Sequence, residues 1–288
     1  MNALTNMEIN ALVRVPVERW NAKHRVACDD SVAEEIPVAL EYNGISHAVM
    51  LASPDDLEDF ALGFSLSEGI VKSRSELYDC EVMPTCDGLQ VQMRIAAERF
   101  AALKDKRRSM TGRTGCGLCG AETLAQAIRR PQPTVGTARF SAERIHAGME
   151  IMKQSQLLQR QTGATHAAAW MHADGTIALV REDIGRHNAL DKLIGAMATR
   201  QMDFTTGAAL ITSRASYEMV QKAAALGIGL LAAISAPTSL AVQLAEESNV
   251  TLVGFVRSNS HVVYARPQRL ERDDPQHSPA GEEKCNEQ

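Results

Sequence analysis

The chain has 288 residues, of which 45% are hydrophobic, so it can bury the core of one large or two smaller domains. Its formal net charge of -5 argues against broad attraction to nucleic acid or acidic membranes, since both need a surplus of Lys and Arg. The first twenty residues lack the apolar core of a signal peptide, and no run approaches the roughly 18 apolar residues of a membrane span, so we expect a cytoplasmic protein.

The first part of the chain predicts a small α+β domain over residues 37–103, preceded by an N-terminal extension, residues 1–36. Two strand-like runs follow Pro37 and are separated by Asn43-Gly44, a dipeptide that favours a type I′ turn. This pattern predicts a β-hairpin.

A helix is expected directly after this hairpin. Ser53 is the predicted N-cap, Pro54 suits the first helical position and Gly69 can end the helix. A second hairpin is predicted around Asp87-Gly88, where two further strand-like runs meet.

Residues 104–134 have a different composition, which predicts a mobile basic loop followed by a linker helix. A basic run at 104–108 leads into a stretch with four glycines and little hydrophobic periodicity, and Cys116 and Cys119 lie within it. Residues 121–130 have the pattern of a short helix with basic residues at its end.

The second half alternates strand and helix signals, which is typical of an α/β domain with helices covering a largely parallel sheet. We expect this domain over residues 135–270 and a disordered polar tail at 271–288. The predicted strands are 208–213, 229–235, 250–258 and 261–265, and the predicted helices are 216–227 and 237–249 together with one that follows Asn188.

The Cys116-x-x-Cys119 pair has three chemical interpretations: half of a zinc site, a dithiol redox pair, or a nucleophilic thiol with a companion. A structural zinc site needs further ligands, and no second C-x-x-C or close His pair is present. A flexible linker whose cysteines have no chemical role is the fourth alternative. The six cysteines include Cys28, Cys80 and Cys86, expected to be buried, and Cys285 in the tail.

The surroundings of Cys116 favour the nucleophile. Arg107, Arg108 and Arg113 precede it and favour the thiolate over the thiol, while neighbouring glycines leave the sulfur accessible. Such a thiolate can attack the sulfur of a donor persulfide, hold it and pass it to an acceptor.

Several motifs together resemble the FdhD family over residues 37–270, nearly all of the folded part. They read TGRTGCGLCG, TGATHAAA, REDIGRHNALDKLIG, SRASYEMVQKA, SAPTSLAVQLA and LVGFVRS. The resemblance implies a homodimeric sulfurtransferase required for formate dehydrogenase activity. Sulfur would pass as a persulfide from a cysteine desulfurase to molybdenum bis(molybdopterin guanine dinucleotide), before insertion of this cofactor into apo-formate dehydrogenase. By this match Cys116 bears the persulfide and Cys119 is its secondary companion.

The resemblance also implies a cytidine-deaminase-like second domain, with three α/β/α layers. The deaminase chemistry does not follow, because zinc deaminases need H-x-E and then P-C-x-x-C. This chain has Ala168 two residues after His166, and its C-x-x-C lies upstream without a preceding Pro. We therefore expect no zinc or other metal.

The family's cofactor-binding segment matches Phe255, Val256, Arg257, Ser258, Asn259 and Ser260 at the end of a predicted strand. Arg257 can pair with phosphate, and the three residues after it supply small polar donors. The alternative is a hairpin turn before the last strand, and the segment can serve as both.

Further candidates for cofactor contact precede two predicted helices, whose N-termini favour anions. The first group is Asp183, Arg186, His187 and Asn188, and the second is Ser213 and Arg214. The alternative is structural, with Asp183 and Asn188 capping the helix and His187 bonded within the protein. His166 lies in an apolar run, where histidine is more often a core residue than a ligand.

A competing hypothesis keeps the cofactor but not the chemistry. The protein would then be a chaperone that binds the molybdenum cofactor and docks onto the apo-dehydrogenase without covalent sulfur transfer. An added sulfur on Cys116 would distinguish the two hypotheses.

Overall fold

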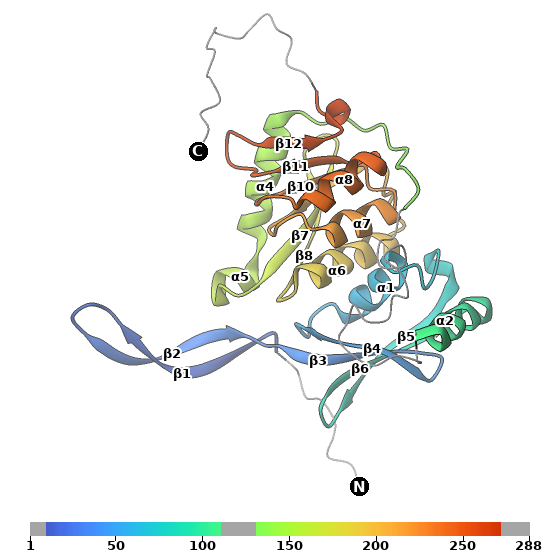
Figure 1. The fold of residues 1–288 in the computed structure, drawn as a ribbon. Coiled ribbons are helices and arrows are strands. Elements are labelled where there is room, and N and C mark those ends of the chain that lie inside the picture. The colour runs from blue at the N-terminus through green and yellow to red at the C-terminus, as the bar shows by residue number, and fades with distance from the viewer. Residues whose placement is uncertain (1–9, 111–130, 272–288) are drawn as a thin grey trace, which may run out of the picture.

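The computed structural model describes residues 10–110 and 131–271 of a mixed α/β protein. The described residues form seven α-helices and three β-sheets of two, four and six strands. Figure 1 shows a long β-ribbon, a small sheet with helix α1 above it, and a larger α/β unit. None of the described helices is long and apolar enough to cross a membrane.

The first sheet is a two-stranded antiparallel ribbon that projects from the body of the protein (Figure 1). It consists of β1 (Leu12–Trp20) and β2 (Arg25–Ala33), paired along their whole length. None of its residues belongs to the two clusters of buried hydrophobic residues. Strands were not predicted in the N-terminal extension, although β1 alternates valines with polar residues.

The second sheet contains both predicted hairpins. Its strands are β3 (Ile36–Tyr42), β4 (Ile45–Ala52), β5 (Leu77–Thr85) and β6 (Gly88–Ile95), in the order β4-β3-β6-β5 with β3 and β6 parallel. Asn43 and Gly44 have φ of 47° and 82°, which confirms the type I′ turn prediction. The second turn lies one residue earlier than predicted, because Gly88 already pairs with Thr85.

Helix α1 (Leu57–Ser67) begins later than predicted. Its N-cap is Asp56, and the backbone of Gly69 takes the left-handed conformation just after its end, as expected. The predicted N-cap Ser53 is wrong, because the Ser53 hydroxyl is buried and donates to the carboxylate of Asp183.

The basic run that was predicted to be a loop is helical up to residue 110, which corrects that prediction. It belongs to α2 (Ala97–Met110), where Leu103 is buried and Phe100 is partly buried against the core. Apolar anchoring and the good helix propensity of Ala, Lys and Arg account for the difference. Cys116, Cys119, Arg113 and the predicted helix at 121–130 lie outside the described residues, as does the tail from 272.

The third sheet is mixed, so the prediction of a largely parallel sheet is wrong. Its strand order is β12-β11-β10-β9-β7-β8, and only the β9–β10 and β10–β11 pairs are parallel. Hairpin connections return β8 along β7 and β12 along β11, and antiparallel pairs need no helical crossover. The strands are β7 (His166–His172), β8 (Ile177–Asp183), β9 (Gly207–Ile211), β10 (Leu230–Ala233), β11 (Thr251–Gly254) and β12 (Val262–Ala265).

Helices cover both faces of this sheet. Successive strand residues point to opposite faces, so Ala167 and Ala169 pack with α4 while Ala168 and Trp170 pack with α6, α7 and α8. The helices are α4 (Ala142–Ser155), α5 (Leu157–Thr162), α6 (Arg186–Thr199), α7 (Tyr217–Ala225) and α8 (Ser239–Glu247).

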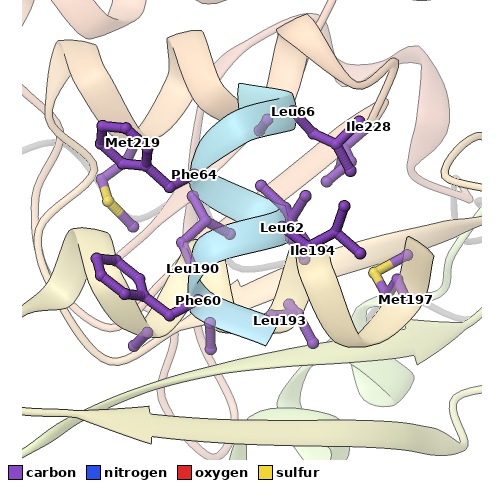
Figure 2. Packing of buried hydrophobic residues seen from close by; sticks show 14 of the residues in the cluster. Phe60, Leu62, Phe64, Leu66, Leu190, Leu193, Ile194, Met197, Met219 and Ile228 are labelled. Atoms are coloured by element: carbon purple, nitrogen blue, oxygen red, sulfur yellow. The ribbon is translucent and has the colours of Figure 1, made fainter. Parts of the chain in front are cut away.

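The small sheet and the larger unit share one hydrophobic core. Figure 2 shows Phe60 and Phe64 of α1 among side chains of α6 and α7. The backbones of α1 and α6 are in direct contact. A Cβ added to Gly63 would lie 1.7 Å from the Asp191 carbonyl oxygen, and one added to Gly195 would lie 1.9 Å from the Asp59 carbonyl oxygen. The predicted domains 37–103 and 135–270 thus contain separate sheets, but the two sheets contribute to one continuous hydrophobic core.

Candidate functional site at the carboxyl edge of the larger sheet

The topology brings the predicted site segments to one edge of the six-stranded sheet. Parallel strands β9, β10 and β11 end at the same edge. The antiparallel pairing of β7 aligns Ala168 with Ile211 and His166 with Asp183, so β8 ends there too. Ligands of open α/β sheets commonly bind beyond the carboxyl ends of the strands.

The segment after β11 contains a tight turn before β12, which is the structural role that the sequence predicted as the alternative to cofactor binding. The amide of Arg257 donates to the Ser260 carbonyl at 2.8 Å. The Arg257 side chain donates to the carbonyls of Ile234 at 2.6 Å and Val256 at 3.0 Å. Val256 is buried and Phe255 is 41% exposed. Part of the hydrogen-bonding capacity of the Arg257 guanidinium is therefore used by backbone carbonyls.

Ser258, Asn259 and Ser260 are exposed and line a hollow of about 700 Å³ against α4. Next to the turn, Nδ1 of His261 lies 2.9 Å from Nε2 of His146 on α4, within hydrogen-bond distance. The remaining lining residues also belong to α4: Ala142, Glu143, Ala147 and Glu150. The predicted cofactor segment thus borders a hollow large enough for part of a nucleotide.

Asp183 and Asn188 point into the protein. One carboxylate oxygen of Asp183 accepts from the amide and hydroxyl of Ser53 and lies 2.7 Å from Nζ of Lys192. The other accepts from the Gly185 amide at 2.8 Å and the Asn188 side chain at 2.9 Å. Asp183 is fully buried, so the geometry gives these residues the structural role of joining the end of β4 to α6.

Arg186 and His187 lie at the N-terminus of α6 and are partly exposed. Nε2 of His187 is 2.7 Å from Oε2 of Glu218, a contact of ion-pair distance whose angle does not meet hydrogen-bond geometry. This imidazole holds the pKa of Glu218 below its ordinary value. Burial, and secondly Arg186 and His187, lower the pKa of His166. Glu218 was not predicted, and its place in the first turn of α7 was the available signal.

The loop after β9 adds polar atoms at the same edge. Ser213 is buried and its hydroxyl donates to the Arg214 carbonyl at 3.0 Å, whereas Arg214 is exposed. The Ser216 hydroxyl and Nε of Arg186 are buried and have no hydrogen-bond partner among the residues that the structure describes. Buried polar atoms are normally paired, so these two can accommodate a polar ligand.

The candidate residues therefore form two groups on opposite faces of the sheet. Arg186, His187 and Glu218 lie on the face covered by α6 and α7, and the hollow beside the 258–260 turn opens on the α4 face. The sequence did not indicate this separation by faces.

Metal ligands and thiols can be assessed only where the structure describes them. Within residues 10–110 and 131–271, no three His, Cys, Asp or Glu side chains are arranged to hold a metal ion. Burial raises the pKa of the Cys80 thiol to about 12, which makes it unreactive. Cys28 is partly buried, and Cys86 is exposed, contrary to expectation.

The fold is that of a mixed α/β protein with a group of candidate polar residues at the carboxyl edge of its larger sheet. The sequence profile of the FdhD/NarQ family matches residues 33–271, and the chain belongs to this family. It is 60% identical over 257 residues to the sulfur carrier protein FdhD of Cupriavidus necator, covering 89% of each chain. The protein of the same name from Bordetella petrii is 56% identical over 241 residues, which are 84% of this chain and 87% of that relative.

A solved structure has the same fold. It is a putative formate dehydrogenase accessory protein from Desulfotalea psychrophila, and it matches with a TM-score of 0.70 and 23% sequence identity. The match covers 91% of this chain and all of that chain.

Proposed function

We propose that this protein carries sulfur for a formate dehydrogenase and that Cys116 is the carrier residue. The main support is the 60% identity to the sulfur carrier protein FdhD of Cupriavidus necator over 89% of the chain. The role of Cys116 rests on the sequence, where a glycine-rich segment and nearby arginines favour an accessible thiolate.

The proposed loading step is thiol–persulfide exchange with a cysteine desulfurase. The Cys116 thiolate attacks the outer sulfur of the persulfide on the desulfurase. The bond between that sulfur and the desulfurase cysteine breaks, and the cysteine leaves as a thiolate. Cys116 then holds the sulfur as its own persulfide. Cys119, which follows Cys116 after two residues in the sequence, is a second thiol that can share it. No net oxidant is needed, since one S–S bond replaces another.

The proposed acceptor is molybdenum bis(molybdopterin guanine dinucleotide), a substrate of this protein that is later inserted into apo-formate dehydrogenase. Its phosphates suit the polar turn Ser258–Ser260 and the N-termini of α6 and α7. Near the N-termini of α6 and α7, Arg186 and the exposed Arg214 supply positive charge, and Nε of Arg186 has no hydrogen-bond partner in the described part of the chain. We place this reaction in the cytoplasm, where thiols stay reduced.

Two finer structural proposals accompany this function. The helix-covered mixed sheet supports a cytidine-deaminase-like arrangement for the second unit. A homodimer is the proposed assembly, and light scattering on the purified protein tests it.

The test is mass spectrometry after incubation with a cysteine desulfurase and free cysteine. We expect one added sulfur on Cys116, lost in Cys116→Ala and retained in Cys86→Ala, which is the control because Cys86 is an exposed thiol outside the C-x-x-C pair. Cys119→Ala shows whether the second thiol shares the sulfur. If the desulfurase turns over and Cys116 gains no sulfur, the sulfur-carrier hypothesis fails and the cofactor-binding chaperone remains.

A further inference from the structure

The turn after β11 is tied to α4 by a pair of histidines. Nε2 of His146 and Nδ1 of His261 are 2.9 Å apart, and the ring centroids are 5.1 Å apart. In the neutral pair one nitrogen donates a hydrogen bond and the other accepts it. A single added proton preserves this bond, because an imidazolium still donates to a neutral imidazole. Two added protons would leave two donors facing each other.

The charges around the hollow would not attract an anion when this pair is neutral. Glu143 and Glu150 of α4 line the hollow, and among the described residues no Lys or Arg side chain lines it. The Arg257 guanidinium donates to the carbonyls of Ile234 and Val256. Burial, followed by the proximity of His146, keeps the pKa of His261 below its ordinary value. A nucleotide phosphate would therefore meet two carboxylates and the neutral imidazole of His261.

We propose that the hollow binds a nucleotide phosphate together with one proton, which the His146–His261 pair takes up from solvent. This inference rests on the proposed function, because it takes the 258–260 turn as the contact for the guanine nucleotide cofactor. A phosphate next to an imidazole stabilises the imidazolium, so phosphate binding and protonation favour each other by the same free energy. The protonated pair supplies the cation that the hollow lacks, and Ser258 and Ser260 supply neutral donors.

Isothermal titration calorimetry with guanosine diphosphate (GDP) tests this coupling. Titrations at pH 7.5 in buffers of different ionisation enthalpy report the number of protons taken up per bound GDP. This pH is above the phosphate's own pKa of about 6, so the phosphate itself contributes little to the uptake. We expect net uptake approaching one proton. Across pH 6.5–8.5 the affinity should rise as the pH falls, by up to about tenfold per pH unit. Guanosine, which has no phosphate, should bind without proton uptake.

Two variants separate the coupling from a loss of structure. The double variant His146→Gln/His261→Gln keeps hydrogen-bonding side chains at both positions but has no imidazole there that can become cationic, so proton uptake should disappear and GDP affinity at pH 7.5 should fall about tenfold. His172→Gln is the matched control: His172 is partly exposed and pairs with Gly207 at the opposite edge of the sheet. It should bind GDP with wild-type proton uptake. Thermal unfolding of each variant verifies that it is folded.

The possible results have distinct meanings. If the wild-type protein does not bind GDP, the proposed cofactor contact at this turn and the coupling both fail. If GDP binds without proton uptake, or the uptake persists in the double glutamine variant, only the coupling fails. If the variants do not fold, the comparison of GDP with guanosine on the wild-type protein decides: equal proton uptake for both refutes the coupling.

Discussion

Removing the ammonium of Lys192 is expected to destabilise the protein strongly. Lys192 and Asp183 are both fully buried, and Nζ lies 2.7 Å from the Asp183 carboxylate. Lys192→Met keeps most of the side-chain volume but leaves a buried carboxylate without a counter-ion. Breaking a buried ion pair in this way costs about 3–5 kcal/mol. Ser53, Gly185 and Asn188 still donate to the carboxylate, so we expect the lower end, about 3 kcal/mol.

Urea unfolding followed by circular dichroism measures this loss as a lower midpoint with an unchanged slope. The double variant Asp183→Asn/Lys192→Met removes both charges and should lose less stability than the two single variants together. A loss below about 1 kcal/mol for Lys192→Met would show that Asp183 does not depend on Lys192. If Asp183→Asn weakens GDP binding while the protein remains folded, Asp183 is a ligand contact and the structural assignment is wrong.

Three further predictions concern packing, pH and the ribbon. Gly63→Ala should cost about 2–3 kcal/mol in thermal unfolding, because its Cβ would lie 1.7 Å from the Asp191 carbonyl oxygen and α1 must move away from α6. The lowered pKa of Glu218 stabilises the fold above the ordinary glutamate pKa, and this small contribution is lost as the pH falls through the lower folded value. Stability of Glu218→Gln should therefore depend less on pH in the acidic range, measured by urea unfolding at several pH values. Trp20→Ser should change stability by no more than about 0.5 kcal/mol, because Trp20 is 69% exposed on the ribbon.

Each of these predictions has a contradicting result. Wild-type stability in Gly63→Ala would mean that the two helices are not in backbone contact. A steeper acid dependence in Glu218→Gln would contradict the sign derived for this carboxylate. A large loss in Trp20→Ser would show that the ribbon supports the core.

The sequence predicted the features that depend on neighbouring residues. The Asn43-Gly44 turn needs only residues that tolerate positive φ, and the alternation from β9 to β12 follows from hydrophobic periodicity. The helical basic run in α2 was missed because its charges were interpreted as a loop, although they suit a helix.

The missed features depend on residues that are distant in the chain. The sequence around Asp183 had the pattern of an exposed helix N-terminus. In the structure its carboxylate accepts a hydrogen bond from Ser53, which is 130 residues away in the chain. His146 and His261 are 115 residues apart in the chain, and His146 lies in α4, a helix that was not predicted. Neither the faces of the mixed sheet nor the hollow could be derived without knowing that β8 and β12 return as hairpins.

The shared core has a consequence for how the chain can be divided. The larger of the two clusters of buried hydrophobic residues runs from Val38 to Ala265 and draws side chains from both sheets, and the α1–α6 contact lies within it. Two polypeptides separated between α2 and α4 would each expose their own part of that cluster to water. We expect such fragments to be insoluble when expressed alone and to regain structure only by complementation, so the chain can serve as a split reporter but not as two independent modules.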